Sequence, residues 1–180
     1  MRVAPSAASA LRALGGTFVV VHVSDVPRAN NDVGERLAHG TQALRSLAAA
    51  CGHMRMTLAV ETPLPHLIGG HPDEFAAVVG ALDRTVGVCF DTSHATLGHH
   101  WDQLIARVGE RLVHVHANDH RGQFDDHLPP GEGVINWGHI RDTLDLVEYR
   151  GWIVLELAAR IDSLPAFMSA ALRRTEELFS

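Results

Sequence analysis

One short segment of the chain concentrates side chains that bind metals and carry protons. The segment 114–133 reads HVHANDHRGQFDDHLPPGEG, and its first fourteen positions hold seven such residues: His114, His116, Asp119, His120, Asp125, Asp126 and His127. Imidazole nitrogens and carboxylate oxygens bind divalent metal ions, and they are also the usual general acids and bases. A solvated polar loop could hold the same residue types without any chemistry. The elements that position these side chains must decide between the two interpretations.

Five short apolar runs in the chain each end in an ionisable residue. The runs are TFVVVH (17–22), MTLAVE (56–61), VGVCFD (86–91), LVHVH (112–116) and WIVLE (152–156), so their last residues are His22, Glu61, Asp91, His116 and Glu156. Helical patterns follow at 33–52, 71–82, 97–109, 135–151 and 163–179, and a further helix is expected near 4–14. Strands that alternate with helices predict βα units and a parallel sheet. In (β/α) barrels the C-terminal ends of such strands form the rim of the active site.

Four of these strand ends form a candidate metal site. If the strands lie side by side, the side chains of Glu61, Asp91, His116 and Glu156 converge on one rim. Three carboxylates in that space would raise one another's pKa, and a divalent cation would remove the repulsion. Such a set suits Mn²⁺, Mg²⁺, Co²⁺ or Zn²⁺ without choosing among them. The alternative is a series of separate surface salt bridges, which the recurrence at every strand end disfavours.

Two further features extend the candidate site. His94 follows the end of its strand by three residues, where it could bind a second metal or a substrate hydroxyl, or begin a helix without any ligand. Asp125 and His127 form an Asp-x-His pair in a loop that continues as LPPGEG (128–133). The prolines stiffen this loop and the glycines let it turn, so we expect the pair to lie over the rim. The alternative for the pair is a solvated loop.

Composition bounds the class of protein. The chain has 180 residues, 46% of them apolar and 20% charged, which is typical of one globular domain. All fifteen basic residues are arginine, so a Schiff-base lysine is excluded. The net charge of −6 argues against nucleic acid as a partner, and no apolar run is long enough to cross a membrane. Cys51 and Cys89 are expected to be buried free thiols, as in a cytoplasmic protein, and Trp101, Trp137 and Trp152 are expected to pack in the core.

The quoted motifs resemble the xylose isomerase-like barrel superfamily, which includes sugar isomerases, sugar epimerases and endonuclease IV-type enzymes. The likeness rests on VVVHVSD, LAVETP, GVCFDTSHA, IVLEL and the segment 114–133, and it covers nearly the whole chain from residue 17 onward. It implies an α/β fold, a partial (β/α)8 TIM barrel of about five parallel βα units. A complete barrel has eight units, so residues 1–180 are expected to be a single domain that lacks the first three. Such a chain would be a fragment, or a shortened relative that completes its site by association.

The HLPPGEG loop followed by INW is most similar to the isomerase and epimerase branch. That resemblance implies a metal-dependent enzyme that transfers protons next to a carbonyl of a sugar or polyol. It implies one divalent ion (Mn, Mg, Co or Zn) with four ligands: Glu61, Asp91, His116 and Glu156. Glu61 and Glu156 would also carry the protons, and His94 and Arg121 would contact the substrate.

Two alternatives remain open at this point. The endonuclease IV pattern implies a phosphodiesterase for abasic DNA with two or three zinc ions, and it adds these ligands: His22, His94, Asp125 and His127. The acidic composition and the missing units count against it. The other alternative is an inactive fragment that binds metal without turnover. The edge strands 17–22 and 152–156 are apolar and free of lysine and proline, so the chain is expected to form homo-oligomers through open sheet edges.

Overall fold

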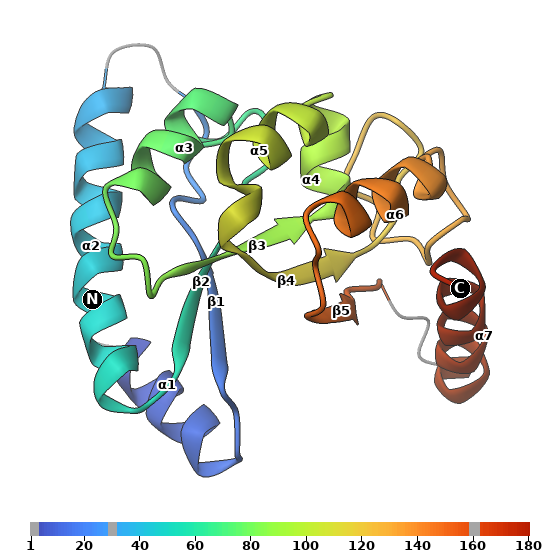
Figure 1. Cartoon of the computed structure of the whole chain (residues 1–180), viewed down its shortest axis with the longest axis horizontal. Helices are drawn as coiled ribbons and strands as arrows, with labels where there is room; N and C mark the ends of the chain where they lie inside the picture. The colour runs from blue at the N-terminus through green and yellow to red at the C-terminus, as the bar shows by residue number, and fades with distance from the viewer. Residues whose placement is uncertain (1–3, 29–31, 159–162) are drawn as a thin grey trace.

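The central element is a curved sheet of five parallel strands (Figure 1). The computed structural model describes residues 4–28, 32–158 and 163–180. The strands lie in chain order: β1 (Phe18–His22), β2 (Thr57–Glu61), β3 (Gly87–Asp91), β4 (Leu112–Ala117) and β5 (Trp152–Leu155). Every neighbouring pair is parallel. The predicted α/β fold with five strands of a partial barrel is therefore confirmed.

Helices cover the outer face of the sheet. They are α1 (Ala4–Ala13), α2 (Val33–His53), α3 (Pro72–Gly80), α4 (Thr92–Leu97), α5 (Trp101–Val108), α6 (Trp137–Leu146) and α7 (Leu164–Leu178), with a 3₁₀ turn at Gly109–Arg111. The helix predicted over 97–109 corresponds to α5, which begins four residues later than predicted, at Trp101. His99, which lies between α4 and α5, has a left-handed φ of 54°, which an α-helix cannot continue. The helix predicted over 135–151 ends at Leu146, and Glu148 just beyond it is also left-handed.

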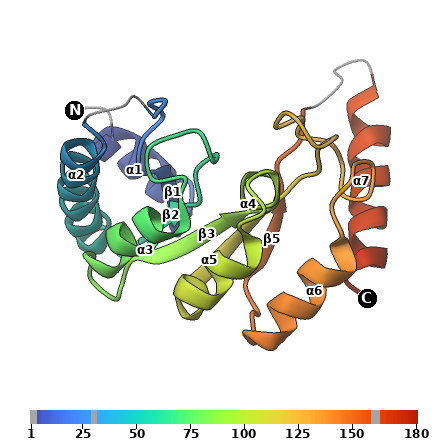
Figure 2. The ribbon, with the colours of Figure 1, turned by 90° about the horizontal axis from the view of Figure 1, so that it is seen from above.

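The hydrophobic core lies between the sheet and the outer helices, as the layers in Figure 2 show. Alternate residues of the strands, such as Val60, Phe90 and Val115, point into this core and are fully buried. Phe90 meets the ring of Trp101 from α5 edge-to-face at 5.4 Å. Because side chains alternate along a strand, the intervening residues face the concave inner side, where the ionisable strand ends lie.

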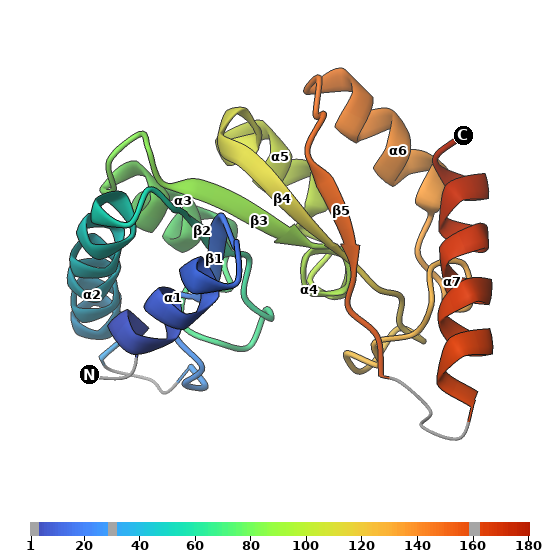
Figure 3. The ribbon, with the colours of Figure 1, turned by 90° about the horizontal axis from the view of Figure 1, so that it is seen from below.

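The sheet is open at both ends, which Figure 3 shows from below. β1 and β5 each have a single partner strand among the described residues. Trp152, expected in the core, is instead 73% exposed, and Val154 beside it is 40% exposed. The sheet has no further strand to cover them on that side within the described part of the chain. Association of copies through these edges stays a prediction.

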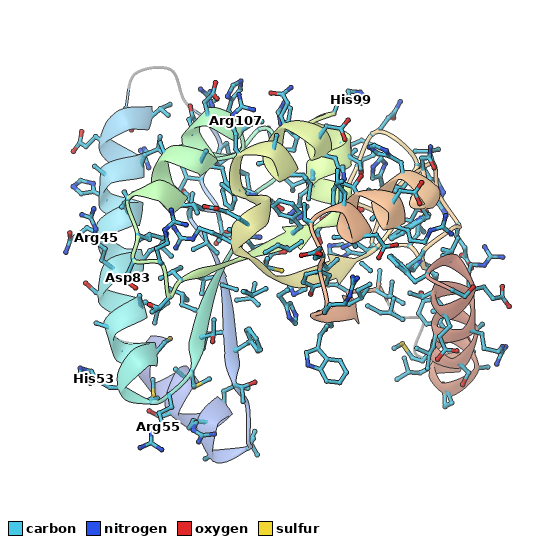
Figure 4. The ribbon with its side chains drawn as sticks, in the orientation of Figure 1. Arg45, His53, Arg55, Asp83, His99 and Arg107 are labelled. Atoms are coloured by element: carbon cyan, nitrogen blue, oxygen red, sulfur yellow. The ribbon has the colours of Figure 1, made fainter. Side chains whose placement is uncertain are left out.

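Polar side chains of the helical layer point away from the sheet. Figure 4 shows Arg45 and His53 on the outer side of α2. The guanidinium of Arg45 donates to the carbonyl of Ala81 at 2.9 Å, which ties α2 to the end of α3. Within the described residues, no helix is long and apolar enough to cross a membrane.

Candidate metal centre at the carboxyl ends of the strands

The centre of the rim is an imidazole held between two carboxylates. His116 Nδ1 lies 2.9 Å from Glu61 Oε1 and 2.7 Å from Glu156 Oε2. One ring nitrogen carries at most one hydrogen, and the hydrogen bond runs to Glu61. Glu156 Oε2 is buried and makes no hydrogen bond with any of the residues that the structure describes. The carboxylates of Glu61 and Glu156 therefore both approach His116 Nδ1, whose single hydrogen cannot serve both of them.

Asp91 completes a set of ligand atoms at this position. One side-chain atom each from Glu61, Asp91, His116 and Glu156 lies within 4.8 Å of all the others. Asp91 is fully buried at the end of β3, and burial raises its pKa to about 6. The donor set of three carboxylates and one imidazole, with one carboxylate oxygen lacking a donor, fits a divalent cation. The residues present therefore suit the metal that the sequence predicted.

Electrostatics at the rim depend on which groups share hydrogen bonds. Burial alone would raise the pKa of Glu61, but hydrogen bonds from His116 and His22 outweigh it and hold that pKa at about 2. Burial alone would lower the pKa of His116, whereas its partners, including Glu156 and Glu61, raise it. Without a metal, a protonated His116 therefore supplies the positive charge that the carboxylates require.

A second group of ligand atoms shares Glu61. One atom each from His22, Glu61 and His94 lies within 4.8 Å of the others. His22 Nε2 is 3.2 Å from Glu61 Oε2, and its Nδ1 is 2.9 Å from Asp25 Oδ1. The imidazole of His22 is thus oriented by a carboxylate on its far side, an arrangement that metal-binding histidines commonly have.

The Asp125–His127 pair reaches the same side of the rim. His94 Nε2 is 3.1 Å from Asp125 Oδ2, which is also 2.9 Å from His127 Nε2. His94 Nδ1 lies 2.8 Å from the carbonyl oxygen of Thr62. Burial alone would lower the pKa of His94, but the hydrogen bond to Asp125 and the charge of Asp91 raise it to about 9. The predicted place of the pair, over the rim, agrees with these contacts.

Strand register explains why these side chains meet. His22 is the register partner of Glu61, and Asp91 is the partner of His116. The carboxylate of Asp91 also accepts from the backbone N–H of His94 at 2.9 Å, so it caps α4. A cap of this kind fixes the start of the helix. The same residue therefore positions His94 relative to the rim.

Sequence reasoning missed Asn118. Its side-chain amide donates to Asp91 Oδ2 at 2.7 Å, and its backbone N–H donates to the hydroxyl of Thr92 at 3.0 Å. Asn118 is fully buried, directly after β4. A hydrogen bond to the second oxygen of a ligand carboxylate orients that ligand. The available signal was its place at a strand end, like that of the predicted ligands.

Asp119 organises the loop that carries the Asp125–His127 pair. Its fully buried carboxylate accepts from the backbone N–H of Gly131 at 3.0 Å, from that of Ile135 at 3.2 Å and from Trp137 Nε1 at 2.8 Å. A side chain at Gly133 would collide with Asp119 Oδ1, so the loop needs glycine there. Asp119 therefore closes the loop between β4 and α6 over the rim.

Replacing Asp119 with asparagine is expected to destabilise the fold. The new amide would place a donor against the N–H groups that now point at an oxygen, and leaving buried donors unpaired is costly. We expect the free energy of unfolding to fall by about 2–4 kcal/mol, measured by urea denaturation. Asp142→Asn is the control, because Asp142 is 70% exposed and, among the described residues, pairs only with its neighbour Arg141. Equal stability of the Asp119 and Asp142 variants would contradict the role.

Arg121 is the predicted site residue that the structure does not bring to the cluster. Its side chain is 68% exposed, and its guanidinium lies 3.4 Å from Asp126 Oδ1. Its backbone N–H donates to the same carboxylate at 2.8 Å. The structure thus places Arg121 in the loop, and its contact with a substrate stays a prediction.

Comparison with known proteins gives one family and several relatives. The model of the family described as xylose isomerase-like TIM barrel matches residues 4–177. An inosose dehydratase of Glaesserella parasuis is 27% identical over 171 residues, covering 81% of this chain and 54% of the relative. A probable endonuclease 4 of Thermoplasma acidophilum is 29% identical over 143 residues, covering 71% and 48%.

A solved structure shows the same fold. The D-psicose 3-epimerase of Clostridium cellulolyticum H10, solved with D-tagatose, superposes with a TM-score of 0.78 at 19% identity. The match covers 98% of this chain and 69% of that one. The chain spans about half the length of the curated relatives it matches.

Proposed function

We propose, because the chain belongs to the xylose isomerase-like TIM barrel family, that it is a divalent-metal-dependent isomerase or epimerase of a small sugar or polyol. The observation that carries the proposal is the position of His116 between Glu61 and Glu156, with Asp91 within reach of all three. The epimerase fold and the inosose dehydratase relative support a hydroxylated carbonyl compound as the substrate class. The carboxylates and the imidazole support metal dependence.

Two glutamates that reach one position from separate strands suit proton transfer. Glu61 is buried at the end of β2, whereas Glu156 follows β5 and its side chain is 45% exposed. A bound divalent ion supplies Lewis-acid polarisation of the substrate carbonyl. One glutamate then removes the proton from the carbon next to that carbonyl, and the other returns a proton to the substrate. Proton removal beside a carbonyl is a first step shared by isomerisation, epimerisation and dehydration of hydroxyketones.

His94 is proposed to hold a substrate oxygen. Its side chain is 6% exposed, and its Nδ1 contacts the carbonyl of Thr62. The raised pKa of His94, to which Asp125 and Asp91 contribute, favours a ring that donates from both nitrogens. Both nitrogens have partners in the structure, so a sugar hydroxyl or carbonyl would share the Nε2–H with Asp125, and that bond would orient the substrate carbon toward the glutamates. We also place this activity in the cytoplasm, where both buried cysteines would stay reduced.

A zinc phosphodiesterase for abasic DNA is the second candidate. The group of His22, Glu61 and His94, continued by Asp125 and His127, would hold further ions beside the first. The endonuclease relative supports this alternative. Against it, the net charge is −6, whereas binding to a DNA backbone depends on positive charge. A metal-binding domain without turnover is the third candidate, and the partial barrel of five strands supports it.

A panel of substrates separates these candidates. We expect the chain, loaded with Mn²⁺, Co²⁺, Zn²⁺ or Mg²⁺ in turn, to convert a ketohexose or an inosose. Chelation should abolish the conversion because the carbonyl then lacks its electrophile. Chromatography of the products and metal analysis of the protein are the measurements. Cleavage of an abasic oligonucleotide by a form with two or three zinc ions would instead support the phosphodiesterase, and binding of one ion with no conversion would support the inactive domain.

A further inference from the structure

The chain's two cysteines are equally buried, but they face different surroundings. Cys51 is 1% exposed on α2 and belongs to the hydrophobic core between the helices and the sheet. Cys89 is 0% exposed on β3, yet it is not a member of that core among the described residues. It lies two residues before Asp91, so its side chain shares the inner face with the rim ligands. Packing in an apolar core therefore explains why Cys51 is buried, but it does not explain the burial of Cys89.

The neighbours of Cys89 include two of the proposed metal ligands, Glu61 and His116. Its register partner on β2 is Glu61, and its partner on β4 is His114, whose ring lies 5.3 Å from that of His116. One atom each from Glu61, Cys89 and His116 lies within 4.8 Å of the other two. This group shares Glu61 and His116 with the rim site, but it replaces Asp91 and Glu156 with a sulfur one step deeper along the strand.

The two sets of donors differ in the ions they prefer. The rim set offers three carboxylates and one imidazole, which suit Mn²⁺ and Mg²⁺ as well as Zn²⁺ and Co²⁺. The set with Cys89 offers sulfur, nitrogen and oxygen, a combination found around zinc. Thiolate ligands select against the hard ions Mg²⁺ and Mn²⁺. The depth of the ion would therefore depend on its affinity for sulfur.

We propose that Cys89 gives the metal centre a second, deeper coordination position for thiophilic ions such as Zn²⁺ and Co²⁺, formed with Glu61 and His116. The inference deepens the proposed function and rests on its metal site. The two positions share two ligands, so one ion excludes the other. When the metal–sulfur bond forms, the thiol proton leaves to solvent and no electron is transferred. An ion at the deeper position lies farther from Asp91 and Glu156, so we expect slower turnover with Zn²⁺ or Co²⁺ than with Mn²⁺.

Absorption of the Co²⁺-loaded chain tests this position directly. Thiolate ligation of Co²⁺ produces a sulfur-to-metal charge-transfer band in the near ultraviolet, which oxygen and nitrogen ligands do not produce. We expect this band in the parent chain and in Cys51→Ser, and we expect Cys89→Ser to lack it. Cys51→Ser is the matched variant because the chain has only two cysteines, so its band must come from Cys89. It decides the question even if Cys89→Ser fails to fold.

Competition between ions tests whether the two positions are distinct. Asp91→Asn should keep the Co²⁺ band and lose Mn²⁺, because Asp91 belongs only to the rim set. Cys89→Ser should lower the affinity for Co²⁺ by at least about tenfold, because mutation of a group that only hydrogen-bonds to a ligand already costs that much. The affinity for Mn²⁺ should stay unchanged. Bound Co²⁺ without the band, or a band that persists in Cys89→Ser, would overturn the inference while the rim site stands. Failure to bind either Mn²⁺ or Co²⁺ would overturn the proposed function together with it.

Discussion

Asp91→Asn is expected to remove Mn²⁺ from the protein. Asp91 is fully buried and lies within ligand distance of Glu61, His116 and Glu156. Asparagine keeps the shape and can still cap α4 through its side-chain oxygen. The Asn118 amide, which now donates to Asp91 Oδ2, can turn over and accept from the new amide through its own oxygen, which lacks a partner among the described residues, so the fold should persist. The negative charge that balances the ion is lost. Mutation of a residue that only hydrogen-bonds to a metal ligand weakens metal affinity by about 10–100-fold. Removal of a ligand carboxylate should therefore lower the affinity for Mn²⁺ by at least about 100-fold.

Elemental analysis after dialysis, with titration of Mn²⁺ by calorimetry, measures this effect. Asp142→Asn provides the control, because Asp142 lies exposed on α6 and changes the net charge by the same amount. The parent and the control should each hold one Mn²⁺ per chain. An Asp91→Asn protein that is folded and binds Mn²⁺ as tightly as the parent would show that the ligand set is wrong.

Glu61→Gln and Glu156→Gln are each expected to abolish exchange of a substrate carbon-bound proton with solvent. Glutamine keeps the size of the side chain and one of its two oxygens as a possible metal ligand, but it cannot accept and return a proton at neutral pH. General acid–base catalysis contributes about 10²–10⁴-fold, so exchange per bound ion should fall by a factor in that range. Affinity for the substrate should fall far less, since binding and proton transfer are separate contributions.

The measurement is the rate of deuterium incorporation at saturating Mn²⁺, normalised to bound metal so that a weaker ion site is not mistaken for lost chemistry. Glu176→Gln is the matched control, because Glu176 is exposed on α7 and is not among the metal-binding groups of the described residues. If either rim variant exchanged at the parent's rate per bound ion, that glutamate would not carry a proton.

The positions of the rim side chains could be predicted from the sequence, because strand alternation and the parallel order of the strands determine them. Strand alternation determines the face on which Glu61, Asp91 and His116 lie, and the parallel order brings their ends to one edge. In the observed register, His22 lies beside Glu61 and Asp91 lies beside His116, so these strand ends meet at one edge. The place of the Asp125–His127 pair was also predictable, since its loop starts directly after β4 and holds the prolines and glycines that let it fold back.

The supporting groups could not be predicted in the same way. Asp119 accepts hydrogen bonds from positions 12 to 18 residues away, and no local pattern specifies which N–H groups a loop will turn inward. Whether Asn118 and Cys89 contact the proposed metal ligands depends on how far each residue lies from the rim along the chain. The strand register sets that distance. The helix predicted over 97–109 was placed four residues too early at its start, because the left-handed φ of His99 keeps α5 from beginning before Trp101. Trp152 is exposed because its strand is an edge, which depends on the neighbours rather than on the residue.

The most direct test of the central claim, that the rim holds a divalent ion for proton transfer beside a carbonyl, is the fate of solvent deuterium. The parent chain, loaded with metal, is incubated in D₂O with each ketohexose or inosose that it converts, and the product is read by mass spectrometry and NMR. The account predicts deuterium on the carbon next to the carbonyl, and no conversion after chelation. Conversion without solvent label would indicate a hydride shift and would contradict the account, as would labelling that continues after the metal is removed.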